Sequence, residues 1–151
     1  MTIPFVRRVA FPALALAAAA AFGSAACSSQ TPDRITVQHI LIAFKGSIPD
    51  AKVTRSIPEA KELAFDLYQR AKKGEDFDAL VKQYTDDEYP GIYAMSNFGI
   101  EPDSARKEYA RNKMVKAFGD VGFRLEVNGI GLAQHDPKDS KYGWHIIKRL
   151  S

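Results

Sequence analysis

The chain has 151 residues, of which 46% are hydrophobic and 26% are charged. These proportions are typical of a globular protein and exclude a disordered or fibrous one, and the length fits one domain rather than two of full size. The formal net charge of +3 includes Arg7 and Arg8, which lie in an N-terminal segment without acidic residues. Without them, 19 basic residues stand against 18 acidic ones. We therefore expect no nucleic-acid partner, because the domain lacks the excess of positive charge that binds phosphate backbones.

Residues 1–26 have the pattern of a secretory signal peptide. Arg7 and Arg8 precede an uncharged run from Val9 to Phe22, and Gly23 to Ala26 supplies the small residues that a signal peptidase needs. The run is shorter than the roughly 20 apolar residues of a membrane-spanning helix. A buried N-terminal helix is the alternative, but five consecutive alanines make a poor core element.

Cys27 is the only cysteine, so it has no partner for an intramolecular disulfide. Ser24-Ala25-Ala26-Cys27 resembles the lipobox of bacterial lipoproteins, in which the cysteine becomes the acylated first residue. Ser24 departs from that pattern, because an aliphatic residue usually stands there. Ordinary cleavage with release of a free secreted protein remains the alternative, and Arg7-Arg8 leaves twin-arginine export open. We expect residues 27–33 to be a lipid-attachment cysteine and a flexible tether, and the protein to reside in the periplasm or cell envelope, anchored to a membrane through Cys27.

The segment from Arg34 to Ala43 is rich in β-branched residues, which predicts a strand. Because side chains alternate between the two faces of a strand, His39 shares one face with Ile35, Val37 and Leu41. A histidine therefore lies in the middle of an otherwise apolar stripe.

Two helices are predicted next. Ser56-Ile57-Pro58-Glu59 has the spacing of a capping box, apolar residues then recur with a helical period up to Ala71, and Gly74 ends the helix. Asp76 caps a second, shorter helix, whose apolar side is formed by Phe77, Leu80, Val81 and Tyr84.

The rest of the chain is more irregular. An acidic cluster (Asp86-Asp87-Glu88) and a Pro90-Gly91 turn precede an edge strand within Ile92–Ile100 and a charged surface insertion from Glu101 to Arg111. Short helical pieces are predicted within Lys113–Leu125, and strands at Ile130–Gln134 and Tyr142–Lys148. This order predicts helices packed against a small, mainly antiparallel sheet, which is an α+β domain over residues 34–151.

Six short segments stand in a characteristic order: Val37 to Ile42 with its histidine, the helix from Ala60, Gly74-Glu75-Asp76-Phe77, Tyr84-Thr85-Asp86-Asp87, Met114 with Phe118 and Phe123-x-Leu125, and Gly143-Trp144-His145-Ile146-Ile147-Lys148. Together they resemble the parvulin (PpiC-like) type of peptidyl-prolyl cis-trans isomerase. The resemblance covers the chain from about Ile35 to its end. It implies a small antiparallel four-stranded sheet packed by about four helices, and an enzyme that assists the folding of exported proteins.

Two segments depart from the family's pattern. Parvulins usually have Gly-Asp-Leu-Gly where this chain has Ser96-Asn97-Phe98-Gly99, followed by a longer insertion. One parvulin branch reads phosphate with basic residues just after the first strand, where Ala43 stands here. The cations of the following loop are Lys45, Lys52 and Arg55, and we expect them to be solvated rather than to select phosphorylated substrates.

Rotation about an X-Pro bond breaks no covalent bond, so the reaction needs no nucleophile, metal or other cofactor. The barrier to rotation is roughly 18–20 kcal/mol, and bringing the uncatalysed reaction from tens of seconds to milliseconds needs about 10⁴-fold acceleration, or roughly 5.5 kcal/mol. A dry apolar pocket helps, because water favours the charge-separated planar amide.

The resemblance assigns the site residues. Met114 and Phe118, with Phe98, would form the pocket for the proline ring, although Met and Phe at helical spacing are usually core residues. Asp87 would face the carbonyl side of the rotating bond. His39 and His145 would hydrogen-bond each other at the centre of the sheet, either to orient the site or to hold the fold, and Ser140 would belong to the same network. His135 matches no family position, and we interpret it as a surface residue.

Three other functions remain as alternatives. A metal site built from His39, His135 and His145 is disfavoured, because no pair of them has the usual ligand spacing. Nucleophilic chemistry is disfavoured, because Cys27 belongs to the tether and no serine lies in an elbow motif. A parvulin-shaped module that binds unfolded exported chains without isomerising them is the main rival, favoured by the altered Ser96–Gly99 segment. In either case we expect a monomer whose partners are proline-containing unfolded or extended polypeptides.

Overall fold

The computed structural model describes residues 31–50 and 52–151. The predicted signal peptide, Cys27 and the first part of the predicted tether lie outside these residues. Within them, no helix combines the length and the apolar character needed to cross a membrane.

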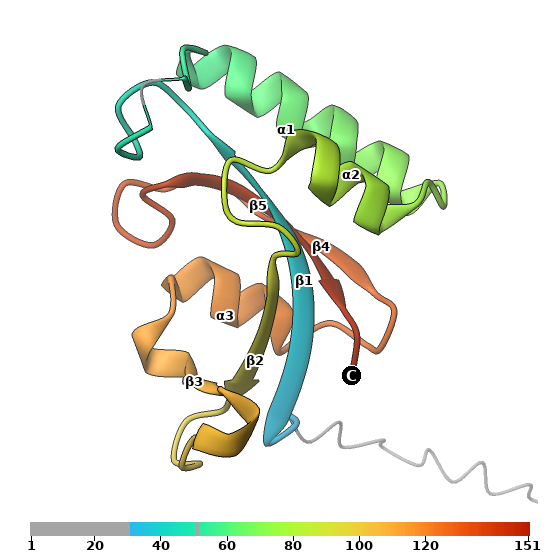
Figure 1. Ribbon diagram of the computed structural model, residues 1–151, viewed down its shortest axis with the longest axis vertical. Coiled ribbons are helices and arrows are strands. Elements are labelled where there is room, and N and C mark those ends of the chain that lie inside the picture. Colours follow the sequence, from blue (N-terminus) through green and yellow to red (C-terminus); the bar gives the residue numbers. More distant parts are fainter. Residues whose placement is uncertain (1–30, 51) are drawn as a thin grey trace, which may run out of the picture.

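A twisted five-stranded sheet forms the middle of the domain, with the strand order β3-β2-β1-β5-β4 (Figure 1). The strands are β1 (Arg34–Ala43), β2 (Ile92–Ser96), β3 (Tyr109–Ala110), β4 (Ile130–Ala133) and β5 (Gly143–Arg149). All neighbours are antiparallel except β2 and β3, which pair in parallel over two residues. The predicted α+β class is confirmed.

The predicted strand around His39 is the central strand of the sheet, and its two faces have the predicted composition. Ile40 and Ile42 face one core, while Ile35 and Val37 face the other. Because both faces are covered, nearly every residue of β1 is buried. The strand is therefore a rigid place from which to present a side chain.

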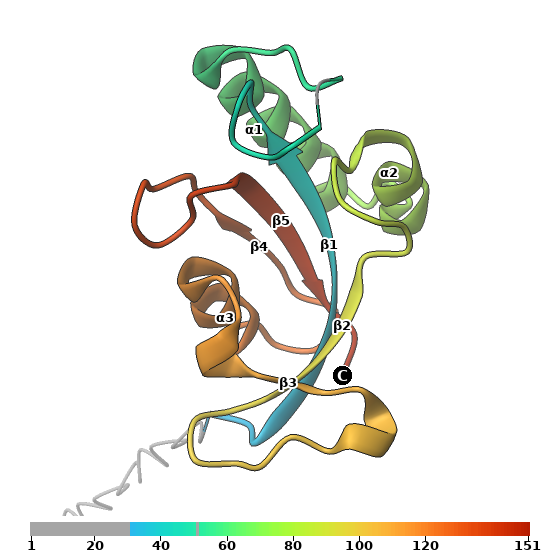
Figure 2. The ribbon, with the colours of Figure 1, turned by 60° about the vertical axis from the view of Figure 1, so that its left-hand side comes forward.

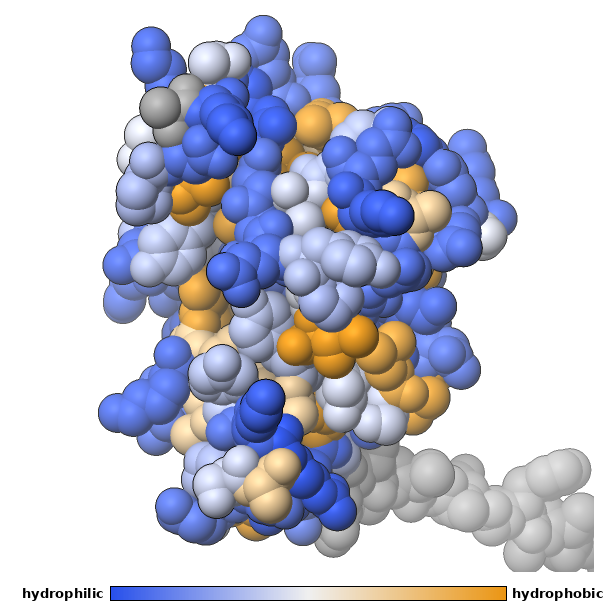
Figure 3. Space-filling model, in the orientation of Figure 1, coloured by the Kyte–Doolittle hydropathy of each residue, from blue (hydrophilic) through white to orange (hydrophobic). Residues whose placement is uncertain are grey.

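Helices α1 (Ile57–Lys72) and α2 (Phe77–Tyr84) cover one face of the sheet (Figures 1 and 2). The predicted capping box is present, because the Ser56 backbone N–H donates to the Glu59 carboxylate at 2.7 Å and Ser56 Oγ accepts from the Glu59 N–H. Asp76 caps α2, because its side chain accepts from the N–H groups of Asp78 and Ala79, the second and third residues of that helix. The outer sides of these helices are predominantly hydrophilic (Figure 3), as expected for helices with one buried face.

Helix α3 (Lys116–Gly122) covers the opposite face, where Phe118 and Phe123 pack against Ile35 and Met95. The segment between β2 and α3 contains two 3-10 turns, η1 (Ser104–Arg106) and η2 (Arg111–Lys113). Arg111 attaches this segment to α3, since its guanidinium donates to the Asp120 carboxylate at 2.7 Å. The same guanidinium lies 4.5 Å from the Phe98 ring centroid and 4.7 Å from that of Phe123.

The element count differs from the expected four strands and about four helices. The predicted surface insertion contributes β3, a strand too short to have a periodic pattern, whereas the helical stretch predicted from Lys113 contains only one α-helix. That helix begins after Met114, whose backbone is extended, with φ −88° and ψ 165°.

Candidate active site

A cavity of about 320 Å³ lies on the α3 side of the sheet, a volume within the range of small-ligand pockets. Its lining comes from β1, β2, β5, the loops after β1 and α2, the loop before β5 and the segment from the end of η2 into α3. The lining residues are His39, Leu41, Ile48, Asp87, Tyr93, Lys113, Met114, Val115, Phe118, Tyr142 and His145. Five of the seven residues predicted for catalysis or substrate binding, all except Ser140 and Phe98, are thus brought to one place.

His39 lies at the centre of a chain of hydrogen bonds across the pocket wall. Its Nε2 lies 3.0 Å from Asp87 Oδ2, and its Nδ1 lies 3.3 Å from the Nδ1 of His145. Tyr93 donates its phenolic hydrogen to the same Asp87 oxygen at 3.0 Å. Among the described residues His145 Nε2 has no hydrogen-bond partner.

These contacts fix the tautomers of both rings. A carboxylate only accepts hydrogen bonds, so His39 carries its hydrogen on Nε2 and, when neutral, accepts at Nδ1. His145 then donates from Nδ1 and leaves Nε2 as a bare acceptor. The polarity of the chain therefore runs from His145 through His39 to Asp87.

Burial and charge set the protonation states of these groups. The hydrogen bond from His39 lowers the pKa of Asp87 to about 2, against the opposing effect of burial. Burial, and then the nearby His39, lower the pKa of His145 to about 3. Burial and the Asp87 charge raise the pKa of Tyr93 above its ordinary value. At neutral pH the wall thus presents a carboxylate, a neutral His145 and a protonated phenol.

Aromatic rings enclose the His39 ring on three sides. Phe118 and Tyr93 meet it edge to face, with ring centroids at 5.1 and 5.3 Å, and His145 stacks on it at 5.4 Å. His39 is only 3% exposed. Packing therefore restricts the ring to one orientation.

The loop after α2 is attached to β1 through consecutive side chains. Thr85 Oγ1 accepts hydrogen bonds from the N–H groups of Leu41 and Asp87, at 3.1 and 3.2 Å. Asp86 accepts from the N–H of Ala43 at 2.8 Å and forms an ion pair with Arg55. These contacts place the Asp87 carboxylate against His39.

The model of the PPIC-type PPIase domain matches residues 25–150. The chain belongs to this family. Among curated proteins, foldase protein PrsA 4 of Bacillus cereus is 32% identical over 100 residues, covering 66% of this chain and 31% of that protein. Chaperone SurA of Pseudomonas fluorescens is 30% identical over 122 residues, covering 81% of this chain and 24% of that protein. This chain thus spans a third or less of the length of these relatives.

A solved structure supports the fold of the PPIC-type domain. The solution structure of TbPIN1 superposes with a TM-score of 0.58 at 23% identity, covering 79% of this chain and 98% of that one. At that identity the likeness concerns the fold alone.

The structure does not bring Phe98 to the pocket of the PPIC-type domain. Phe98 is 62% exposed and is absent from the pocket lining, because Arg111 holds its ring at the outside of the insertion. Met114 and Phe118 do line the pocket, and Phe118 is also a core residue at 2% exposure. Phe118 is therefore a core residue that also lines the cavity, and its role in substrate binding stays a prediction.

Ser140 and His135 have positions that sequence reasoning did not predict. Ser140 is buried, but its hydroxyl donates to the Gly143 carbonyl at 2.8 Å and bonds to neither pocket histidine. His135 is half-buried rather than a free surface residue, with its Nδ1 2.9 Å from the Ser140 carbonyl and its ring against Phe44 and Trp144. Both residues shape the loop before β5. In the described part of the chain, no group of three or more His, Cys, Asp or Glu residues is placed to hold a metal ion.

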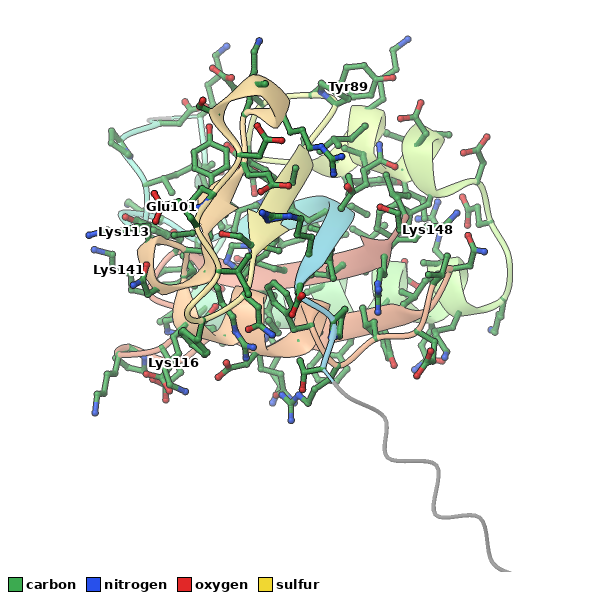
Figure 4. The ribbon with its side chains drawn as sticks, turned by 90° about the horizontal axis from the view of Figure 1, so that it is seen from below. Tyr89, Glu101, Lys113, Lys116, Lys141 and Lys148 are labelled. Carbon is green, nitrogen blue, oxygen red and sulfur yellow. The ribbon has the colours of Figure 1, made fainter. Side chains whose placement is uncertain are left out.

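The loop cations are not equivalent. Arg55 was expected to be solvated, but it pairs with Asp86 and donates to the Ala43 carbonyl at 3.0 Å. Lys45 and Lys52 are exposed and do not line the pocket, whereas Lys113 does. In Figure 4, Lys113 and Lys141 project from the same side of the domain.

Sequence reasoning missed Tyr93, the second hydrogen-bond donor to Asp87. Tyr93 pairs with Val37 across β1 and β2, so its side chain points to the same face as His39. The Ile92–Ile100 strand was predicted, but without its register no pattern in the sequence shows which of its residues meets Asp87.

Proposed function

We propose that this PPIC-type domain is a peptidyl-prolyl cis-trans isomerase that acts on X-Pro bonds of unfolded or extended polypeptides. The observation that favours this function is the position of the Asp87–His39–His145 chain, which forms one wall of a pocket whose other walls are mainly apolar. The family match and the relatives named foldase and chaperone support a polypeptide substrate.

In this mechanism the proline ring enters the apolar side of the pocket, beside Met114 and above Phe118. Excluding water there weakens the charge-separated planar form of the amide and so lowers the barrier to rotation. Asp87 lies beside the reacting bond as a fixed anion. Both of its side-chain hydrogen bonds from described residues end on Oδ2, so Oδ1 has no side-chain donor among these residues and can face the substrate. A negative charge near the carbonyl oxygen disfavours the resonance form in which that oxygen is negative.

In this mechanism His39 is a positioning residue. Its Nε2–H holds Oδ2 of Asp87, and its own orientation is set by His145 and the surrounding rings. His39 and His145 thus position the Asp87 carboxylate and do not transfer protons, because rotation about the bond transfers no proton.

NMR exchange spectroscopy on a short Ala-Pro peptide with the full chain tests this function. Asp87→Asn retains the shape of the side chain and an acceptor for His39 but removes the charge. We expect it to lower kcat/KM at least about tenfold, roughly 1.4 kcal/mol of barrier. Met114→Ala should raise KM, and the exposed control Lys61→Gln should match wild type. A folded wild-type chain that gives no acceleration above background would overturn the proposal.

A non-catalytic binding module is the second candidate, favoured by the Ser96–Gly99 segment and by the exposed position of Phe98. It predicts that the chain suppresses aggregation of an unfolded protein equally well as wild type and as Asp87→Asn. If Asp87→Asn loses both the suppression of aggregation and the isomerisation, a binding module that is independent of catalysis is excluded.

We further propose that residues 1–26 direct export and that Cys27 is the lipid-attachment site, which would hold the domain at a membrane outside the cytoplasm. Metabolic labelling with a fatty acid should mark the wild-type chain and not Cys27→Ser. Labelling that persists in Cys27→Ser would refute acylation at this position.

A further inference from the structure

Strand β2 is an edge strand for half of its length. Its outer neighbour β3 pairs only with Met95 and Ser96, at one end of β2 (Figures 1 and 2). Residues Ile92 to Ala94 pair with β1 on their inner side. In the described part of the chain no strand lies opposite Ile92 and Tyr93 on the outer side, and β3 begins opposite Met95, next to Ala94.

The backbone of this free stretch points its amide groups outward at alternate residues. The His39 N–H donates to the Gly91 carbonyl at 3.0 Å, and the register places Tyr93 opposite Val37. In an antiparallel pair the hydrogen-bonding residues alternate, so the amide groups of Gly91 and Tyr93 face β1. Those of Ile92 and Ala94 therefore face away from the sheet, which is the arrangement that accepts an added strand.

A groove with a volume of about 490 Å³ runs along this edge. Tyr89, Ile92 and Tyr109 line it, with exposed fractions of 51%, 48% and 50%. They are half of the six large hydrophobic side chains that are exposed in the described part of the chain. Such a concentration beside unpaired backbone groups marks an interaction site rather than scattered exposure. Tyr89 is held in place by its hydroxyl, which donates to Asp78 at 2.9 Å.

Tyr93 connects this groove to the proposed proline pocket, because it is a lining residue of both. Its ring contacts His39 and Phe118 of the pocket and also Tyr109 of the groove, the last with a centroid distance of 5.8 Å. Figure 4 shows Tyr89 and Lys113 on different sides of the domain, so a chain that occupies both sites turns around Tyr93. The groove also has Glu88 and the pair Arg106 and Lys107 along its lining, which provides charges of both signs for a polypeptide.

We infer that the outer edge of Ile92–Ala94 binds the part of the client polypeptide that flanks the X-Pro bond, as an added β-strand. The inference rests on the proposed function, which supplies the client. Backbone hydrogen bonds to Ile92 and Ala94 give affinity without sequence specificity, and the Tyr89–Tyr109 walls take apolar side chains of the client. The site would thus favour long, extended clients over short peptides.

Peptides of two lengths test the inference on the full chain. The short peptide has four residues and contains an Ala-Pro bond. Two longer peptides contain the same four residues, one with eight more residues before the X-Pro bond and the other with eight more after it. We expect the longer peptide whose extension reaches the edge of β2 to bind about tenfold more tightly than the short peptide, as two added backbone hydrogen bonds would provide. Ala94→Pro removes one outward N–H without touching the β1–β2 ladder and should reduce this advantage to less than about threefold.

Two further arms keep the test independent of how Ala94→Pro folds. Ile92→Ser should weaken binding of the extended peptide, whereas Ile57→Ser, at the same exposed fraction of 48% on α1, should not. N-methylation of every second residue in the extension can be placed on either of two alternating sets of residues. Methylation of one set should abolish the tighter binding of the extended peptide and methylation of the other should leave it, because an added strand uses every second amide.

The outcomes separate the inference from the proposed function. If the chain isomerises the short peptide but binds extended peptides no more tightly, the inference about the groove is overturned and the proposed isomerase function stands. If the wild-type chain binds extended peptides more tightly but does not isomerise them, and Ile92→Ser loses the tighter binding, the inference about the groove is supported and the proposed isomerase function is overturned. A wild-type dimer in ultracentrifugation that Ile92→Ser converts to a monomer would assign the edge to a second copy and overturn the inference.

Discussion

His39 illustrates how a single polar side chain is held in an apolar interior. Its two nitrogen atoms are hydrogen-bonded, and its ring is packed by Phe118, Tyr93 and His145. The desolvation cost of the imidazole is offset by the charged acceptor Asp87, since hydrogen bonds to charged groups are the stronger ones. Removing any neighbour would therefore loosen the ring that positions the carboxylate.

His145 should make the domain sensitive to acid. Its pKa is lowered from 6.5 to about 3, so below pH 6.5 the unfolded chain takes up a proton that the folded chain excludes. Stability therefore falls as the pH is lowered from 6.5 towards 3, by about 3 kcal/mol between pH 7 and pH 4 from this group. Urea unfolding at the two pH values should show a smaller difference in His145→Leu. Equal pH dependence in both chains would contradict the buried neutral state.

At the scale of elements, the end of β1 leaves no room for a side chain at the start of β5. Gly143 has φ +141°, and a Cβ placed on it would lie 2.1 Å from the Ile42 carbonyl oxygen. Only glycine permits this approach. The strand that presents His145 is thus aligned with β1 through a residue that has no side chain.

Gly143→Ala should therefore cost far more than backbone strain alone. We expect a loss of more than about 3 kcal/mol in the free energy of unfolding, because the strands must separate in addition to the roughly 1–3 kcal/mol of a strained backbone conformation. Gly46→Ala is the matched control, since Gly46 also has a positive φ but no atom within 4 Å of an added Cβ. Similar losses in the two variants, measured by urea unfolding, would show that the contact with Ile42 is unimportant.

Local signals in the sequence predicted the elements well. The capping box at Ser56, the Asp76 cap and the alternation of β1 depend on neighbours within a few residues, and the structure confirms all three. The pocket histidines and Asp87 were located through the family resemblance. Tyr93 and the exposed position of Phe98 were not predicted, because they depend on strand register and on contacts of Arg111 with residues distant in the sequence.

At the scale of the whole molecule, one sheet separates two cores. Leu67 and Leu80 belong to the core under α1 and α2, whereas Phe118 and Met95 belong to the core under α3. The candidate site lies on the α3 side, where Phe118 belongs to the α3 core. Its remaining wall comes from the loop after α2, which carries Asp87, and from a smaller cluster around Leu41.

This division predicts that stability and activity can be separated. Leu67→Ala should destabilise the domain by about 2–5 kcal/mol, as expected for a fully buried leucine, while kcat/KM of the folded protein stays near wild type. Phe118→Ala should lose a similar amount of stability together with most of the activity. Chemical denaturation and peptide isomerisation under strongly native conditions measure the two quantities. A comparable fall of kcat/KM in Leu67→Ala would show that the cores are coupled.

The pairing of β1 with β5 has a consequence for how the domain folds. Val37 lies opposite Arg149, and Ala43 lies opposite Gly143, so the centre of the sheet joins segments about a hundred residues apart. Closing so large a loop costs entropy before any contact compensates it, which places the domain among slowly folding topologies. While the chain is being synthesised, neither core can close until β5 is available. A segment that ends before Gly143 should therefore remain unfolded and susceptible to proteases, whatever the quality of its helices.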